Sequence, residues 1–232
     1  MIEAKKVVKR FGLKVILKGV DFHVKRGEFV VLVGPNGAGK TTFLRILATL
    51  SRANMGEIKI GGFHLPRDAA SVRKILGVVS HQPLLYGDLT AEENLEFYAR
   101  MYNLQNVSER VQEVLVLVGL QVRRKDLLRE FSRGMQQRLA IGRAILHNPT
   151  LLLFDEPHSG LDQEAAAMLD NLLREVAAQG RTVVMTSHDL LRTPDLADRV
   201  DILSKGMIRA SLRGADLDPQ KLPSLYRSAV ND

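Results

Sequence analysis

The sequence has no cysteine among its 232 residues. This absence excludes a disulfide framework, a thiolate metal site and a cysteine nucleophile, and it fits a reducing compartment. No apolar run approaches the roughly 18 residues that a membrane-spanning helix needs. Residues 1–6 also lack the apolar segment of a signal peptide. We therefore expect a cytoplasmic chain that does not itself span a membrane.

The composition is that of an ordinary soluble globular protein, with 45% hydrophobic and 25% charged residues. The length suits one large domain or one domain with a subdomain. The formal net charge of +7 permits acidic partners such as a nucleotide, a nucleic acid or an anionic membrane surface. Because lysine and arginine are spread along the chain, a role of this charge in solubility alone is an equal alternative.

A glycine-rich segment followed by lysine and threonine is the most informative stretch. It fits the pattern G-x-x-x-x-G-K-[ST] of phosphate-binding loops, and its residues are Gly34, Pro35, Asn36, Gly37, Ala38, Gly39, Lys40, Thr41 and Thr42. The β-branched run 29–33 predicts a buried strand before this loop, and the apolar spacing in 41–50 predicts a helix after it. A strand, a glycine loop and a helix in this order form the context that a nucleotide site requires.

Each part of this loop has a role in binding a nucleoside triphosphate. Gly37 and Gly39 let the backbone bend so that successive N–H groups face the phosphates, and the helix adds its positive dipole end. Lys40 would neutralise the β- and γ-phosphates, and the Thr41 hydroxyl would hold Mg²⁺. The alternative is a glycine-rich turn with a chance lysine.

Two acidic residues directly follow the apolar run 151–154. A buried strand that ends in two carboxylates needs a nearby cation, and Mg²⁺ at the phosphate loop would supply it. We predict that Asp155 holds this metal and that Glu156 is the catalytic base that polarises the attacking water. Two solvated acids at a strand end are the alternative.

Two further polar residues end predicted strands. His188 follows the strand predicted over 182–187, and Gln82 follows the one predicted over 77–81. Neighbouring parallel strands end at the same sheet edge, where ligands bind. We therefore predict that His188 reaches the γ-phosphate, as a catalytic residue together with Glu156 and Lys40, and that Gln82 touches Mg²⁺ or the attacking water. A structural histidine and an exposed loop glutamine are the alternatives.

The order of the predicted elements indicates an α/β fold with a P-loop NTPase core and a parallel sheet. Residues 2–9 and 20–26 read as an N-terminal antiparallel β-subdomain, and the turn between them carries Phe11, a candidate for stacking on adenine. A capping-box pattern at Thr90 opens a mostly helical block, which predicts a helical subdomain inserted at about 88–148. We predict one domain over 1–214 and a weakly patterned tail over 215–232.

Taken together, these motifs resemble those of the ATP-binding cassette (ABC) ATPases. The resemblance rests, in chain order, on the phosphate loop, Gln82, segments 132–138, 151–157 and 159–162, and His188. It spans roughly residues 2–210, and the combination is far more specific than any single motif. It implies an ATP hydrolase that uses ATP and Mg²⁺, with Thr41, Gln82 and Asp155 at the metal and Phe11 on the adenine.

The resemblance also implies partners. Two copies of such a domain sandwich two ATP molecules head to tail. Ser132 and Gly134 of one copy would bind the γ-phosphate at the other copy's phosphate loop, and Asp162 would link the two sites. Gln82 would couple the site to integral membrane transporter subunits. The chain would then work at the inner face of the cell membrane, with no nucleic acid as partner.

The sequence departs from the family's Leu-Ser-Gly-Gly-Gln signature, because it reads Phe131, Ser132, Arg133, Gly134 and Met135. The serine, the second glycine and the helix start are kept, so we expect the anion site to survive. An arginine in place of glycine predicts a backbone without positive φ at that position. Arg133 itself could add charge near the phosphate or simply face solvent.

Residues 77–95 and this variant signature resemble the ATPase subunit of the haem exporter of cytochrome c maturation. Exporters of other cargo, of the drug or polysaccharide type, share much of this pattern, so the cargo stays open. A soluble ABC ATPase acting on nucleic acid or the ribosome is a second class, but such proteins usually carry tandem cassettes or a coiled-coil insertion. A P-loop kinase or another hydrolase is a third class, and it would leave the signature segment and His188 without a role.

Overall fold

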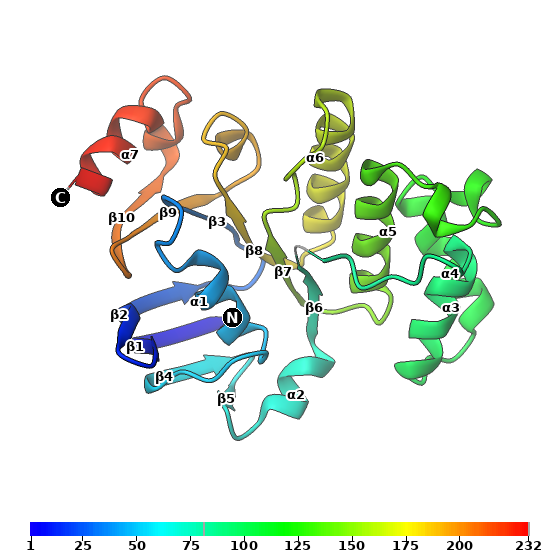
Figure 1. The fold of residues 1–232 in the computed structure, drawn as a ribbon, viewed down its shortest axis with the longest axis horizontal. Helices are drawn as coiled ribbons and strands as arrows, with labels where there is room; N and C mark the ends of the chain where they lie inside the picture. The colour runs from blue at the N-terminus through cyan, green and yellow to red at the C-terminus, as the bar shows by residue number, and fades with distance from the viewer. Residues whose placement is uncertain (81, 232) are drawn as a thin grey trace.

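The computed structural model describes residues 1–80 and 82–231. Figure 1 shows two sheets side by side, with helices packed around the larger one. The α/β fold, the antiparallel N-terminal sheet and the helical block between β6 and β7 are confirmed. His81, the last residue of the strand predicted over 77–81, lies outside the described residues.

The smaller sheet is antiparallel and has the order β2-β1-β4-β5. Its strands are β1 (Ile2–Phe11), β2 (Lys14–Val24), β4 (Met55–Ile60) and β5 (Phe63–Leu65). Both predicted N-terminal strands are longer than expected, because they pair as a hairpin in which Phe11 lies opposite Lys14. The predicted start at residue 20 was therefore wrong. Strand β5 was not predicted, since only its pairing with β4 defines three residues as a strand.

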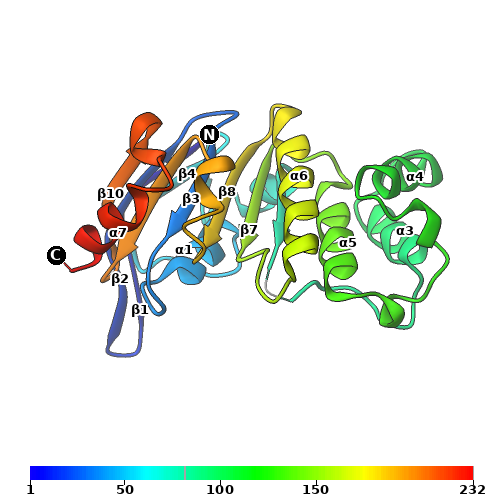
Figure 2. The ribbon, with the colours of Figure 1, turned by 90° about the horizontal axis from the view of Figure 1, so that it is seen from above.

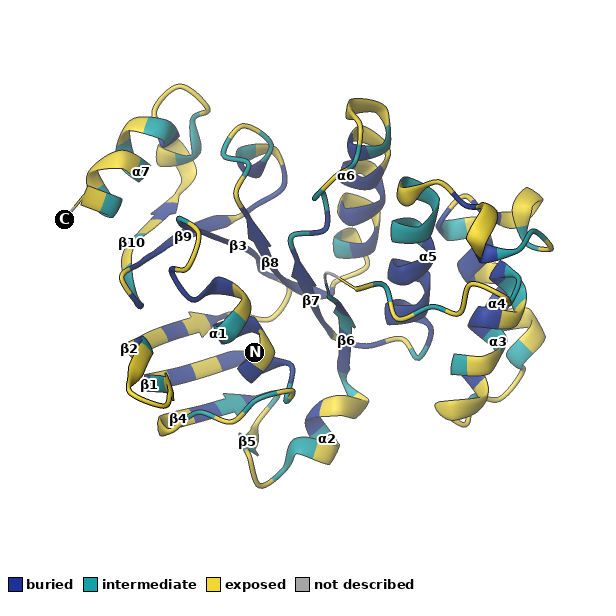
Figure 3. Cartoon of the chain, viewed as in Figure 1, coloured by how far each residue is buried: buried dark blue, intermediate teal, exposed yellow. Residues whose placement is uncertain are grey.

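The larger sheet has the order β10-β9-β3-β8-β7-β6, and all its pairs except β9–β10 are parallel. Its strands are β3 (Phe29–Val33), β6 (Leu76–Val79), β7 (Leu151–Asp155), β8 (Thr182–Ser187), β9 (Arg199–Ser204) and β10 (Met207–Arg213). Every residue of β3, β7, β8 and β9 is buried (Figure 3). Continuous apolar runs predict such strands, because helices or a second sheet cover both faces.

The central strand β3 connects two core clusters. Val30 and Leu32 pack with the antiparallel sheet and with α1 (Lys40–Leu47). Val31 and Val33 belong to the other cluster, which includes α5 (Arg133–Ile145) and α6 (Gln163–Ala178). This alternation holds the loop after β3 between the two layers, and that loop is the phosphate-binding segment.

The inserted helices α3 (Ala91–Met101) and α4 (Val107–Leu117) lie at the end of the molecule opposite the β1–β2 hairpin (Figure 2). The capping box predicted at Thr90 is confirmed. The Thr90 hydroxyl accepts from the Glu93 N–H at 3.1 Å, and the Glu93 carboxylate accepts from the Thr90 N–H at 2.8 Å. Two short 3₁₀ turns, η1 (Gln121–Arg123) and η2 (Leu128–Glu130), lead from α4 to α5.

The remaining helices are short or peripheral. They are α2 (Ala69–Lys74), the 3₁₀ turns η3 (Thr193–Asp195) and η4 (Gly214–Leu217), and α7 (Leu222–Asn231) in the tail. Leu222 is fully buried, so the weak pattern of the tail still forms a helix that packs on the core. Within the described residues, no helix combines the length and apolar character needed to cross a bilayer.

Candidate nucleotide-hydrolysis site

The phosphate loop adopts the bend that its glycines predict. Gly37 has φ 79° and Gly39 has φ 110°, a region that other residues rarely adopt. A Cβ on Gly39 would also lie only 2.7 Å from the end of the Leu17 side chain, so a larger residue would both strain the backbone and displace Leu17 of β2. The helix α1 begins at Lys40, and its N-terminal N–H groups point towards the loop.

Lys40 is almost fully buried inside this loop. Its ammonium donates to the backbone carbonyls of Gly34 at 2.7 Å and Pro35 at 3.3 Å, and it lies 3.8 Å from the Glu156 carboxylate. Burial lowers the pKa of Lys40, and the neighbouring carboxylates of Glu156 and Asp155 oppose that effect. A cation is thus held in the centre of the loop, where phosphate oxygens would bind.

Asp155 ends the buried strand β7 and meets the phosphate loop. One oxygen of its carboxylate accepts from the Thr41 hydroxyl at 3.0 Å and from the Thr186 hydroxyl at 2.8 Å. Mg²⁺ prefers hard oxygen ligands and takes one or two from protein when phosphates supply others. The convergence of the Thr41 hydroxyl and the Asp155 carboxylate fits this metal. Thr186 was not predicted, because its position next to Asp155 depends on the pairing of β7 with β8.

Gln82 is not joined to this pair. It is exposed, and its backbone carbonyl accepts from the Ser80 hydroxyl at 2.7 Å. Among the residues that the structure describes, no hydrogen bond links the Gln82 side chain to Thr41 or Asp155. Its role at the metal stays a prediction.

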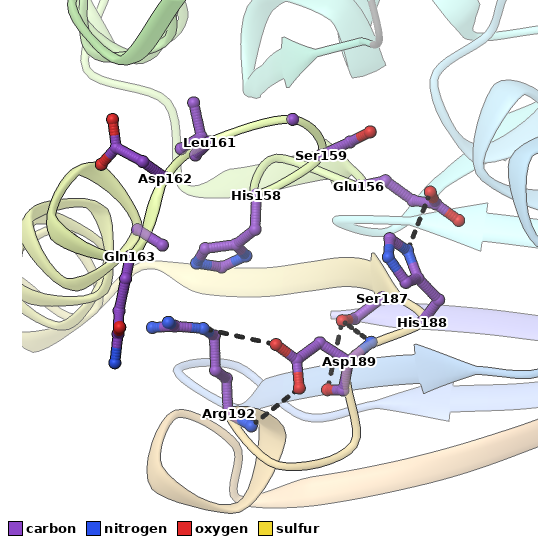
Figure 4. Close-up of a pocket in the computed structure, with 12 residues that line it drawn as sticks. Glu156, His158, Ser159, Leu161, Asp162, Gln163, Ser187, His188, Asp189 and Arg192 are labelled. Atoms are coloured by element: carbon purple, nitrogen blue, oxygen red, sulfur yellow. Dashed lines mark hydrogen bonds and ion pairs between the residues drawn. The ribbon is translucent and has the colours of Figure 1, made fainter.

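Glu156 lies between the phosphate loop and the following loop. One carboxylate oxygen faces Lys40, and the other lies 3.2 Å from Nδ1 of His188 (Figure 4). The backbone of Glu156 has φ 48°, a strained conformation for this residue type. Its N–H donates to the Thr186 hydroxyl at 2.9 Å, which fixes this turn against β8. The structure thus brings together Lys40, Asp155, Glu156 and His188, as the sequence predicts for one sheet edge.

The signature segment forms the start of α5. The Ser132 hydroxyl accepts from the Met135 N–H at 3.3 Å as the helix N-cap, and Arg133 is not among the described residues with positive φ. The groove above the phosphate loop is lined by Lys14, Ile16, residues 36–42 and Glu156. Of the described residues, neither Ser132 nor Gly134 lines it. Lys14 and Ile16 were not predicted, because they come from β2 and reach the groove only through the packing of that strand.

Phe11 also lies outside this groove. It ends β1 at the hairpin tip with 57% of its surface exposed, and the Lys9 ammonium lies 4.8 Å from the centre of its ring. Adenine stacking on Phe11 therefore remains a prediction.

A comparison with protein families decides the assignment of this site. The family described as "ABC transporter" matches residues 17–159, which include the phosphate loop, the signature segment and both acids after β7. The chain belongs to the ABC transporter family. The ABC cassette predicted from the motifs is thereby confirmed.

Two curated relatives of this cassette carry names that refer to resistance or export. The linearmycin resistance ATP-binding protein LnrL of Bacillus subtilis (strain 168) is 37% identical over 94% of this chain and 70% of that protein. The Nod factor export ATP-binding protein I of Paraburkholderia xenovorans (strain LB400) is 36% identical over 88% of this chain and 68% of that protein.

A solved structure shares the fold of this cassette. It is described as the dimeric structure of a post-hydrolysis state of the ATP-binding cassette MJ0796 bound to ADP and Pi. It is 30% identical, has a TM-score of 0.82, and matches 92% of this chain and 98% of that chain.

Proposed function

We propose that this cassette hydrolyses ATP as a homodimer and drives a membrane exporter. The observation that carries the proposal is the position of Glu156, held between Lys40 and His188 at the edge of the phosphate loop. A carboxylate in this position can polarise a water molecule aimed at the γ-phosphate. Mg²⁺, when held by Thr41 and Asp155, would neutralise charge on the phosphates.

The residues of the chain divide the work as follows. Lys40 and the N-terminal N–H groups of α1 bind phosphate oxygens and stabilise the developing charge. Glu156 orients the water and accepts its proton, and His188 holds the carboxylate of Glu156 in position at 3.2 Å. Because the Glu156 carboxylate already contacts Lys40 and His188 in the structure, these groups need little reorganisation to reach the transition state.

A second copy would complete the site. Ser132 and Gly134 stand at the start of α5 but do not line the groove over their own phosphate loop. The similar cassette MJ0796 is described as a dimer bound to ADP and Pi. We infer that the signature segment of one copy faces the phosphate loop of the other, as the resemblance to the ABC ATPases implies.

An exposed aromatic surface supports a membrane subunit as partner. It follows Gln82 in the chain and comprises Leu84, Tyr86, Phe97, Met101 and Tyr102, all exposed. Tyr86 and Phe97 pack edge to face with ring centres 5.1 Å apart. Exposed apolar side chains that lie together are typical of an interaction site, and a membrane subunit bound there would place the cassette at the inner face of the cell membrane.

The names of the relatives favour an exporter of the drug-resistance or Nod-factor type, since one refers to resistance to linearmycin and another to Nod factor export. Haem remains an alternative cargo that rests on residues 77–95 and the variant signature alone. The proposal is tested first on hydrolysis, because hydrolysis is independent of the cargo.

The test uses Glu156→Gln in the purified protein. Loss of a general base lowers turnover by about 10²–10⁴-fold, so we expect ATP binding and ATP-dependent dimerisation to persist while phosphate release nearly stops. Glu175→Gln, an exposed carboxylate on α6, is the control and should hydrolyse ATP as the wild type does. Normal turnover of Glu156→Gln, or a protein that stays monomeric with ATP in light scattering, would contradict the proposal.

A further inference from the structure

Four side chains outside the phosphate loop form a connected polar network beside the site. Nε2 of His158 lies 2.7 Å from one oxygen of Asp170, and Arg192 donates to the other oxygen at 2.9 Å. A second nitrogen of Arg192 lies 3.3 Å from the Asp189 carboxylate. The chain of contacts therefore runs from His158 through Asp170 and Arg192 to Asp189.

These residues come from three separate segments. His158 lies two residues after Glu156 in the loop that follows β7, and Asp170 lies on α6. Asp189 and Arg192 lie in the loop that follows β8, one and four positions after His188. Figure 4 shows His158 and Arg192 in the same pocket, with Glu156 and His188 along its rim. The network therefore ties the loop that carries Glu156 to the loop that carries His188.

Asp170 is the centre of the network and is largely buried. Burial by itself opposes its ionisation, but the hydrogen bond from His158 and the charge of Arg192 outweigh that effect and lower the pKa of Asp170. A buried carboxylate is stable only when both oxygens have partners. His158 and Arg192 each supply one, so removal of either side chain leaves one oxygen of the buried Asp170 without that partner.

The loop around His158 transmits its position to Glu156. The Ser159 N–H donates to the Glu156 carbonyl at 3.0 Å, and the Leu161 N–H donates to the His158 carbonyl at 3.2 Å. These two turns make the segment from Glu156 to Leu161 a compact unit rather than a loose loop. A shift of His158 would therefore shift the Glu156 carboxylate relative to Nδ1 of His188.

We propose that His158 is a positioning residue for ATP hydrolysis, which it supports through Asp170 and Arg192 by holding Glu156 in register with His188. The inference rests on the proposed function, since it assigns Glu156 as the base. Misplacement of a catalytic group by about 1 Å lowers rates by up to about 10²-fold. His158 touches neither the phosphate loop nor Lys40 in the described structure, so ATP binding does not depend on it.

The experiment measures kcat, KM and ATP affinity for purified His158→Ala and His158→Gln. We expect His158→Ala to lower kcat by about tenfold or more with ATP affinity close to that of the wild type, and to lower the melting midpoint because one oxygen of Asp170 loses its partner. His158→Gln keeps a donor that can reach Asp170 and should recover most of the lost rate. Arg192→Ala should resemble His158→Ala, whereas Arg174→Ala is the matched control, because Arg174 joins α6 to the Asp195 carbonyl without contacting Asp170.

A double-mutant cycle separates positioning from a general structural role. If His158 acts through Glu156, then His158→Ala should cause no further loss in the Glu156→Gln background. Additive losses, a parallel fall in ATP affinity, or a kcat of His158→Ala equal to that of the wild type would overturn the inference. If His158→Ala does not fold, Arg192→Ala carries the same cycle. Absence of ATPase activity in the wild-type protein would overturn the proposed function itself. Additive losses in an active protein would overturn only the role of His158, so the two failures are distinguishable.

Discussion

Gly134 in the signature segment provides a sharp test of how this cassette is packed. An ideal Cβ built on Gly134 would lie 2.8 Å from the Cβ of Ala165, at the start of α6. Carbon atoms in contact are ordinarily about 3.5–4.0 Å apart. Both atoms are attached directly to helix backbones, so a side-chain rotation cannot relieve the contact. The glycine therefore permits the close approach of α5 and α6, whatever it also does for a phosphate.

Two opposing effects determine the result of Gly134→Ala. Alanine in place of glycine inside a helix gains up to about 1 kcal/mol of intrinsic preference. Forcing an extra methyl group into a packed contact costs about 1–3 kcal/mol. We expect the clash to win, with a net loss of roughly 0–2 kcal/mol and a melting midpoint lower by about 2–4 °C for each kcal/mol.

The decisive measurement is a double-mutant cycle with Ala165→Gly, followed by urea unfolding. Removing the Ala165 methyl group should make room for the new one, so the two substitutions should couple by about 1–2 kcal/mol in favour of the double variant. The control is Gly87→Ala, whose ideal Cβ would lie 4.0 Å from the nearest atom and should show no coupling to Ala165→Gly. A coupling energy of zero for Gly134→Ala would refute the close-approach explanation.

Three further predictions concern the buried His147, the magnesium ligand Thr41 and the stacking of adenine on Phe11. Nε2 of His147 contacts the Leu76 carbonyl at 3.1 Å, while Nδ1 is buried with no partner among the described residues, and burial lowers the pKa of His147 from its ordinary 6.5. As the pH falls, the His147 imidazole becomes protonated in the unfolded chain before it does in the folded chain. The contribution of neutral His147 to stability is therefore complete above pH 6.5 and is lost as the pH falls through its lower folded-state pKa. The slope in urea unfolding should reach at most about 1.4 kcal/mol per pH unit, and His147→Gln should flatten it whereas the exposed His23→Gln should not. Thr41→Val removes the hydroxyl that contacts Asp155, so it should raise the Mg²⁺ concentration for half-maximal ATPase activity by at least about tenfold, and an unchanged requirement would argue against Thr41 as ligand. Phe11→Ala should weaken ATP binding in fluorescence titrations by about 1–3 kcal/mol while Phe11→Tyr should not, and equal affinities would remove Phe11 from the adenine site.

The sequence predicted those parts of the site in which a short run of neighbouring residues is compatible with a single backbone structure. The pattern G-x-x-x-x-G-K-[ST] between a β-branched run and a helix predicts a bend of the backbone at Gly37 and Gly39, and both residues have positive φ there. The apolar run before Asp155 required a strand covered on both faces, and β7 is fully buried. In each case the chemistry of neighbouring residues along the chain was sufficient.

The features that were missed depend on contacts between distant residues. The first half of β2 reads as no clear strand, yet Leu17 packs against Gly39 and Lys14 lines the groove over the phosphate loop. The pairing with β1 decides that strand, and it joins residues far from the motif. In the same way, Thr186 reaches Asp155 only because β7 and β8 are neighbours in the sheet.

The sequence by itself determined the class of chemistry, which is the binding and hydrolysis of a nucleoside triphosphate. The phosphate loop needs only a strand before it and a helix after it, and the two acids and His188 need only to follow a strand, so short segments of sequence are enough to predict them. Tertiary structure alone decided how these groups are held. It placed Glu156 between Lys40 and His188. It also joined His158 through Asp170 to Arg192, which lies 34 positions further along the chain. The physical reason is that distances of about 3 Å between side chains depend on how strands and helices pack, which no local pattern of residues encodes.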